Sequence, residues 1–238
     1  MKKTLLIVST LTILLFSCTQ DRPINTYLIV DFTQTVDGNP LEKNSLEYTN
    51  AVGQNYSVQN LWYIISDITL HSDNGDNIIK DYHFINIENP STLSFSINNL
   101  ADGNYTSISY TLGLDSTKNS SYKYVNEDFH TTMAWPEMMG GGYHYMILEG
   151  NFNNDFTFYN THTGGTMGND FSFTHTDVIS LITDKHTTDA SININMEINN
   201  WYTNPNTINL TTDGIMGNMD MQMQLKQNGV DVFSTITD

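Results

Sequence analysis

The sequence contains a single cysteine, Cys18, among 238 residues. One thiol cannot close a disulfide within the chain, so the fold cannot depend on one. Basic residues are also scarce, because 9 Lys and Arg stand against 26 Asp and Glu, for a formal net charge of −17. So acidic a chain repels nucleic acid and offers no surface that could follow a phosphate backbone. The acid could favour cation binding, but the solvated surface of an exported protein is the stronger explanation.

Long apolar runs are missing after the first residues. The one clear run, Leu5 to Phe16, is too short to span a membrane comfortably. Lys2 and Lys3 precede it, and it ends in Leu15-Phe16-Ser17-Cys18, which resembles a bacterial lipobox, where the signal is cut before a cysteine that receives lipid. The alternative is an uncleaved anchor with a chance cysteine.

We therefore expect residues 1–17 to be a lipoprotein signal peptide, residues 18–26 a tether lipidated on Cys18, and residues 27–238 one folded domain. Thr19 provides no inner-membrane retention signal of the aspartate kind. The expected localisation is the cell envelope, lipid-anchored to the outer membrane and facing the periplasm or the surface. The lipid anchor is the only membrane contact expected.

Helical periodicity is weak throughout, while short alternating runs separated by turn pairs such as Asp37-Gly38 and Asn74-Gly75 are frequent. This pattern predicts an all-β fold, an antiparallel Greek-key β-sandwich of one domain. The expected strands are Leu61–Leu70, Tyr82–Ile87, Leu93–Ile97, Tyr105–Leu114, Tyr143–Leu148, Phe156–His162, Val178–Ile182, Ile192–Ile198 and Met219–Leu225.

Linear signatures of enzymes are absent: there is no nucleophile elbow, phosphate loop or zinc-protease helix. The single cysteine is assigned to lipid, and Glu127-Asp128 are adjacent, so on a strand they would face opposite ways. We expect a protein that is not an enzyme.

Seven histidines remain as candidate metal ligands, since neutral imidazole is a common ligand that also suits copper. None is paired at a short ligand spacing such as H-x-H, so any site must be assembled by the fold. His144 alternates with Tyr143 and Tyr145, shares a face with Met146 and needs a hydrogen-bond partner or a metal. His71 ends a strand before a turn and is expected to be solvated, His83 is a lesser candidate, and His186 lies in a charged loop.

Methionines offer a second soft ligand set. Met219, Met221 and Met223 alternate with polar residues and could bind Cu(I) through thioethers, although an inward strand face gives the same spacing and is the stronger interpretation. Met133 to Gly150 is less regular. There Pro136 stiffens the turn after Trp135, and Gly140-Gly141-Gly142 let the chain fold back beside itself. We interpret it as a site loop, and the alternative is a glycine-rich connection with a structural tryptophan.

The order of motifs resembles the MbnP-like copper-binding family, the β-sandwich proteins encoded beside methanobactin genes and widely in bacterial envelopes. The resemblance rests on Tyr48–Gln54, Leu61–Leu70, Asp102–Tyr105, Leu112–Asn119, Met133-Ala134-Trp135, Gly142-Tyr143, Leu148-Glu149-Gly150 and His162 before its glycines. It covers nearly the whole mature chain. It departs from the family at Glu137, where the family has a second tryptophan, and at the added Met138-Met139 and glycines.

The resemblance implies copper, as Cu(I) or Cu(II), held by histidines. It also implies kynurenine in some members, made from tryptophan by a dihaem, peroxidase-like partner enzyme. Carried over residue by residue, the Met-x-Trp motif falls on Met133 and Trp135, and the histidine before the glycines falls on His162. From the position of the loop we predict His144 and His162 as ligands of one site and His130 as the third, with Trp135, Met133, Met138 and Met139 close to the metal. The predicted function is copper storage, delivery or sensing by an envelope lipoprotein. The alternative is a non-catalytic glycan- or protein-binding sandwich that displays Trp62, Trp135 or Trp201 on a flat face.

Overall fold

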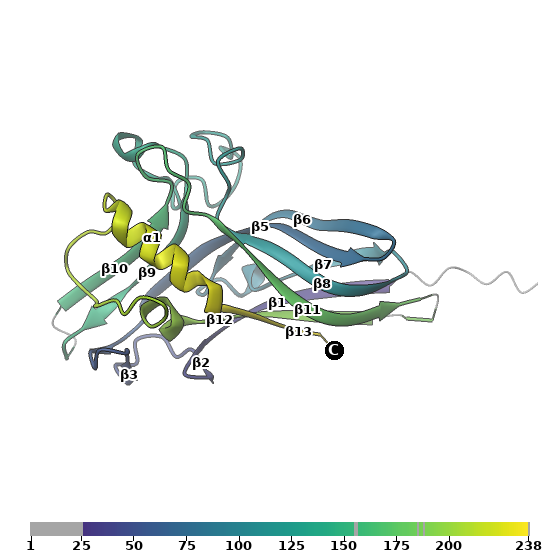
Figure 1. Cartoon of the computed structure of the whole chain (residues 1–238), viewed down its shortest axis with the longest axis horizontal. Helices are drawn as coiled ribbons and strands as arrows, with labels where there is room; N and C mark the ends of the chain where they lie inside the picture. Colours follow the sequence, from purple (N-terminus) through teal and green to yellow (C-terminus); the bar gives the residue numbers. More distant parts are fainter. Residues whose placement is uncertain (1–25, 155–156, 185, 188, 238) are drawn as a thin grey trace, which may run out of the picture.

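Two β-sheets packed face to face build the protein (Figure 1). The computed structural model describes residues 26–154, 157–184, 186–187 and 189–237. The expected signal peptide, Cys18 and nearly all of the tether lie outside the described residues. The predicted all-β sandwich is confirmed, and the expected strands are present with shifted ends, with Met219–Leu225 as the exception.

The smaller sheet has the strand order β13-β12-β1-β2, and β7 also pairs with β1. All of its pairings are antiparallel except that of β1 with β12, which is parallel. Its strands are β1 (Thr26–Val36), β2 (Asn39–Pro40), β7 (Ser94–Leu100), β12 (Asp189–Glu197) and β13 (Phe233–Thr237).

The larger sheet has the order β11-β8-β5-β9-β4-β3, with β6 also on β5 and β10 also on β9. All of its pairings are antiparallel. Its strands are β3 (Tyr48–Thr49), β4 (Asn55–Tyr56), β5 (Asn60–Ser72), β6 (Gly75–Asn86), β8 (Gly103–Leu112), β9 (His144–Phe152), β10 (Thr157–Gly164) and β11 (Phe173–Thr183).

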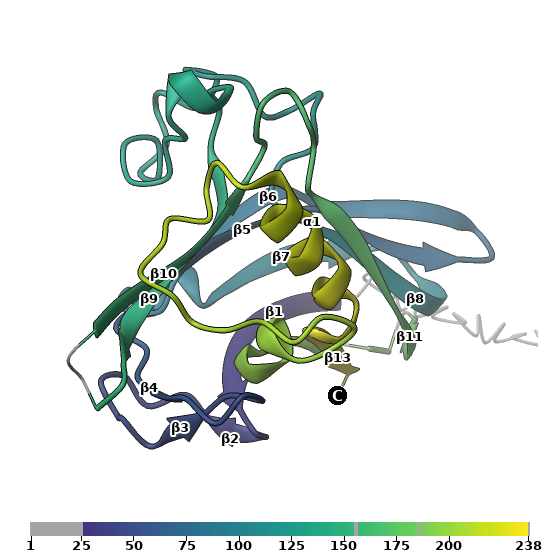
Figure 2. The same ribbon diagram turned by 60° about the vertical axis from the view of Figure 1, so that its left-hand side comes forward.

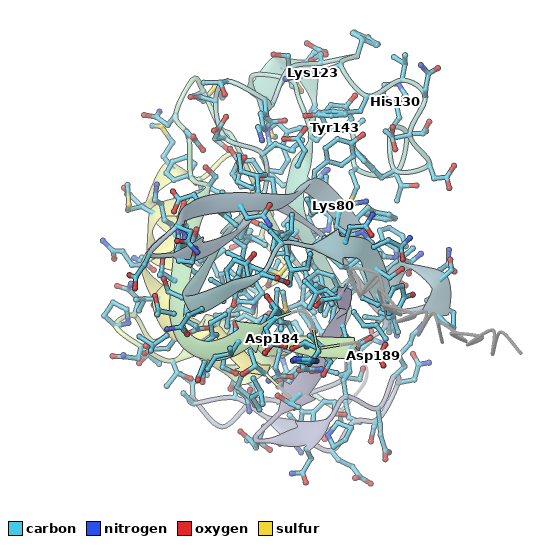
Figure 3. The ribbon with its side chains drawn as sticks, turned by 90° about the vertical axis from the view of Figure 1, so that its right-hand side faces the viewer. Lys80, Lys123, His130, Tyr143, Asp184 and Asp189 are labelled. Atoms are coloured by element: carbon cyan, nitrogen blue, oxygen red, sulfur yellow. The ribbon has the colours of Figure 1, made fainter. Side chains whose placement is uncertain are left out.

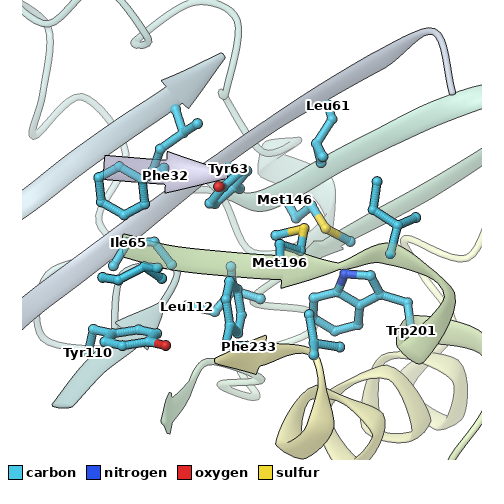
Figure 4. Packing of buried hydrophobic residues seen from close by; sticks show 14 of the residues in the cluster. Phe32, Leu61, Tyr63, Ile65, Tyr110, Leu112, Met146, Met196, Trp201 and Phe233 are labelled. Carbon is cyan, nitrogen blue, oxygen red and sulfur yellow. The ribbon is translucent and has the colours of Figure 1, made fainter. Parts of the chain in front are cut away.

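The main core lies between the sheets (Figure 4). Alternate residues point into it, as period-two strands require: Ile192, Ile194 and Met196 of β12 are buried. Trp201, from the short helix η3 (Ile198–Tyr202), closes one end and is fully buried.

A second core lies on the other face of the larger sheet. Ile64 belongs to it while Ile65 belongs to the main core, and Ile147 and Leu148 divide in the same way. The cover is the long connection 113–143 between β8 and β9, which contributes Tyr124, Phe129, Met133 and Tyr143. This connection includes the short 3-10 helix η2 (Glu137–Met139) and forms the lobe above the sheet in Figure 1.

The segment predicted as the last strand is instead a helix, α1 (Met219–Asn228), which contacts the edge strand β10 (Figure 2). Asn218 caps it by accepting a hydrogen bond from Met221 N–H, and the unbranched residues that follow favour helix. Met219 and Met223 are 47% and 44% exposed, so the predicted inward methionine ladder does not exist. Within the described part of the chain, no helix has the length and apolar character needed to cross a membrane.

Candidate functional site

The glycine-rich stretch folds back on itself as predicted. Trp135 N–H donates to the carbonyl of Gly142 at 2.9 Å, and His144 N–H donates to the carbonyl of Met133 at 2.7 Å. Gly140, Gly141 and Gly142 all have positive φ. A Cβ on Gly142 would lie 2.6 Å from the Asn119 side-chain oxygen, so the reversal needs both the left-handed backbone and the missing side chain.

His144 and His162 are brought together by this reversal and by the hairpin of β9 and β10. Their ring centroids are 5.1 Å apart and their planes are nearly perpendicular, at 82°. His162 pairs across the ladder with Ile147, whose side chain faces the second core, so the pair lies on the face covered by residues 113–143. His144 is only 6% exposed.

Each histidine has one nitrogen committed and one without a partner. His144 Nδ1 lies 3.1 Å from the carbonyl oxygen of Met133, and His162 Nε2 lies 2.9 Å from a carboxylate oxygen of Glu149. The Met133 carbonyl can only accept a hydrogen bond, and so can the Glu149 carboxylate when it is ionised. His144 Nδ1 and His162 Nε2 therefore carry the protons. The lone pairs of the neutral rings are then on His144 Nε2 and His162 Nδ1. Both atoms are buried without a hydrogen-bond partner among the described residues.

The electrostatics favour neutral His144 beside charged Glu149. Burial, helped by the proximity of His162, lowers the pKa of His144 to about 4. The hydrogen bond from His162 lowers the pKa of Glu149, whose other oxygen accepts a hydrogen bond from the Asn60 side chain at 2.8 Å. A metal ligand needs an unprotonated nitrogen, and a carboxylate on the opposite ring nitrogen is the usual support for a ligating histidine.

Trp135 forms one wall of the site. Its ring lies 4.6 Å from that of His144, centroid to centroid, at an angle of 74°. Gly164 backs it closely, because a Cβ there would lie 2.6 Å from Cε3 of the indole. The side chain is 2% exposed and its Nε1 has no partner among the described residues. The indole therefore covers His144 and helps to keep bulk water away from it.

Gln222 of α1 holds the edge strand on which His162 lies. Its Nε2 donates to the carbonyl of His162 at 2.8 Å, and its Oε1 accepts from Gly164 N–H at 3.2 Å. These backbone groups belong to the outer edge of β10, which would otherwise be open to another strand. The side chain thereby completes the ladder next to the site.

The comparisons with known proteins bear on what this arrangement is. The family model of MbnP matches residues 25–222. The chain belongs to the MbnP family. Among solved structures it is similar to MbnP from Methylosinus trichosporium, with 10% identity and a TM-score of 0.55 over 88% of this chain and 97% of that one. At that identity the likeness shows a shared fold. The comparison with curated proteins gives no match.

Membership in the MbnP family supports the copper-associated role that the order of motifs implies. It does not supply the ligands. Among the described residues there is no group of three or more His, Cys, Asp or Glu side chains arranged to hold a metal ion. Any site for copper at His144 and His162 is therefore a site of few ligands.

The structure does not bring His130 to the pair. Its Nδ1 lies 2.8 Å from the hydroxyl of the neighbouring Tyr143 (Figure 3). Its ring also lies near that of Tyr122. It lines a surface cavity of about 370 Å³ together with Trp135, Pro136 and Glu137. Trp135 thus separates this cavity from His144, because it contacts both.

The predicted methionines do not gather around the histidines. Met133 meets His144 through its carbonyl, and its side chain packs in the second core. Met138 is 82% exposed, and the Met139 methyl group lies near Gly217.

The tryptophans likewise form no flat exposed face. Trp135 and Trp201 are buried, and the partly buried Trp62 donates its indole N–H to Asn86. The alternative function loses the aromatic platform on which it depended.

Glu149 and Gln222 are the residues of the site that sequence reasoning did not assign. Glu149 could have been found by counting back across the β9–β10 hairpin, since antiparallel pairing places it opposite Asn160, two residues before His162 and within reach of it. Gln222 carries no such signal, because α1 reaches β10 only through the tertiary fold.

Proposed function

We propose that the protein binds one copper ion between His144 Nε2 and His162 Nδ1, and that it stores, delivers or senses copper in the cell envelope. The observation that carries the proposal is the pair of buried imidazole nitrogens, neither of which has a hydrogen-bond partner among the described residues. Two such acceptors in adjoining rings are costly unless something binds them.

The donor set favours Cu(I) over zinc. Structural zinc sites have four protein ligands and catalytic ones have three, whereas the described residues provide two imidazoles. Cu(I) accepts two ligands, and imidazole suits copper. Bound copper would supply Lewis-acid and one-electron chemistry, and the residues present would hold and shield it.

The surrounding residues fit such a role. Glu149 fixes the tautomer of His162, Met133 fixes that of His144, and Trp135 helps to keep water away from His144. A site with few ligands, lying at an edge strand, is suited to a metal that is passed on. The proposed location follows from the lipobox at Cys18, and a dihaem partner follows from the family resemblance alone.

The test is an anaerobic Cu(I) titration in competition with a chromophoric chelator, run on the soluble domain with zinc in parallel. His144→Gln and His162→Gln are expected to lose at least about 100-fold in Cu(I) affinity. That is the upper end of the loss seen when a residue that only supports a metal ligand is mutated. His175→Gln is the matched control, because His175 is a histidine of β11 that packs beside Tyr110 of the neighbouring strand β8. His130→Gln should bind like the wild type. Copper affinity unchanged in both His144→Gln and His162→Gln would remove the proposal.

The state of Trp135 is a separate question with its own measurement. Conversion to kynurenine exchanges one carbon for one oxygen, and an intact-mass spectrum of protein from its native envelope detects that change. We expect the unmodified indole, because the family's second tryptophan is Glu137 here and Trp135 is enclosed by Gly164 and His144.

A further inference from the structure

A chain of three hydrogen-bonded side chains crosses the outer face of the larger sheet away from the histidine pair. His71 Nε2 lies 2.7 Å from the hydroxyl oxygen of Ser109, and His71 Nδ1 lies 2.7 Å from a carboxylate oxygen of Asp76. The chain sits at the hairpin end of β5, whereas the other end of β5, from Asn60 to Tyr63, pairs with β9. It is therefore independent of the proposed copper site.

The sheet register explains the alignment. His71 and Asp76 are directly opposite one another in the β5–β6 hairpin. Ser109 of β8 pairs with Thr69, two residues before His71, so the imidazole reaches it diagonally. Leu70 and Ile108 are fully buried in the main core, which turns the neighbouring His71 and Ser109 to the outer face.

The order of atoms is that of an activated nucleophile. An ionised Asp76 can only accept, so His71 Nδ1 donates to it and His71 Nε2 keeps a lone pair for the Ser109 hydroxyl proton. A nucleophile on a base that is held in turn by a third group is the arrangement of serine hydrolases. Solvent reaches the chain, because the side chains of His71 and Asp76 are 30% and 67% exposed.

We propose that Ser109 is a nucleophilic serine that accepts acyl groups from small activated carboxylic esters, with His71 as its general base and Asp76 as the positioning residue for His71. Ser109 Oγ forms a bond to the acyl carbon while its proton passes to His71 Nε2. The ester C–O bond breaks, and the leaving oxygen takes that proton. Water then attacks the acyl carbon while one of its protons passes to His71 Nε2. The bond between Ser109 Oγ and the acyl carbon breaks, Oγ takes the proton back from His71, and the carboxylic acid leaves.

The sheet limits the rate of this reaction. Ser109 lies within β8 between β5 and β11, where pairing with Thr69 and Thr176 uses the backbone groups around it. Backbone N–H groups are thus not aimed at a developing oxyanion, and the acceleration rests on base catalysis, on the order of 100-fold or more. The site should take only esters with a good leaving group.

This inference departs from the sequence-based expectations that His71 is merely solvated and that the protein is not an enzyme. Those expectations rest on linear motifs. Here the three residues come from three strands, and Ser109 is far from His71 in sequence, so no spacing reveals them.

The experiment uses metal-free protein and 4-nitrophenyl acetate, with peptide mass spectrometry of quenched samples. Acetyl is expected on Ser109, and nitrophenolate release should fall about 100-fold, to background, in Ser109→Ala and His71→Gln. Asp76→Asn should lose the activity and Asp76→Glu should restore part of it, which a purely structural role would not do.

Ser107→Ala is the matched control, because Ser107 is the next residue of β8 on the same face and pairs with His71 across the ladder. It should react like the wild type. Thermal unfolding verifies that each variant is folded. Acetylation of Ser109 no faster than that of Ser107, or an unchanged rate in folded His71→Gln, would overturn the proposal and leave the three residues as a brace for the hairpin.

Discussion

Gly164 is the position where a single methyl group should disturb the candidate copper site most directly. A Cβ there would lie 2.6 Å from Cε3 and 2.7 Å from Cζ3 of the Trp135 indole, and ordinary contacts begin near 3.4 Å. The ring would have to move by roughly 1 Å in a packed interior, and overpacking of this kind costs about 1–3 kcal/mol. The indole already lies 4.6 Å from the ring of His144, so its displacement disturbs the pair as well.

The assay is thermal unfolding of Gly164→Ala with tryptophan fluorescence. A protein of this size loses about 2–4 °C in Tm per kcal/mol, so a fall of about 2–12 °C is expected. Gly103→Ala is the control. Gly103 is also a strand glycine beside an aromatic ring, but a Cβ there would lie 3.4 Å from Tyr105, which is an ordinary contact. Gly103→Ala should therefore gain up to about 1 kcal/mol of stability, because alanine makes the unfolded chain stiffer. Equal stability of the two variants would refute the reasoning.

Three further predictions concern charge and anchoring. Glu149→Gln should weaken Cu(I) binding about 10- to 100-fold without unfolding the protein, because the carboxylate that orients His162 is lost; chelator competition measures it, and unchanged affinity would count against the assigned tautomer. Burial lowers the pKa of His83, which stacks on Phe32, so the unfolded chain gains its proton first as the pH falls. The stability from this group is complete above about pH 6.5 and declines below it. His83→Phe should therefore flatten the pH dependence of urea unfolding between about pH 7 and pH 5 relative to the wild type, and an identical slope would contradict this account. Cys18→Ser should release the protein from membrane fractions, and unchanged sedimentation would exclude the lipid anchor.

Period-two patterns sufficed to predict most strands, because each strand has one buried and one less buried face. The failure at Met219–Leu225 has a local cause. Alternating methionines satisfy a strand pattern, but the Asn218 cap, Asp220 in the first turn and Lys226 in the last favour a helix, and these are end signals that periodicity ignores.

The ligand pair was predictable only in part. The family motifs bring His144 and His162 to attention, while alternation predicts that His144 shares a face with Met146 and Leu148, which belong to the main core. The structure places His144 against His162 instead. The reason is a β-bulge: Thr163 pairs with Met146 and Gly164 with His144, so Tyr145 is passed over in the ladder.

That bulge explains why the motif glycines matter. Tyr145 turns into the main core and covers Gly113, where a Cβ would lie 2.3 Å from the ring and where φ is +87°. Gly150 lies under a carbonyl in the same way, since its Cβ would be 1.8 Å from the oxygen of Ser57, and Gly164 lies under Trp135. Each glycine is visible in the sequence, but the group packed on it comes from a distant segment. The glycines therefore indicate close approach to the backbone, and only the fold shows that two of these approaches, at Gly113 and Gly164, set the positions of His144 and its tryptophan wall.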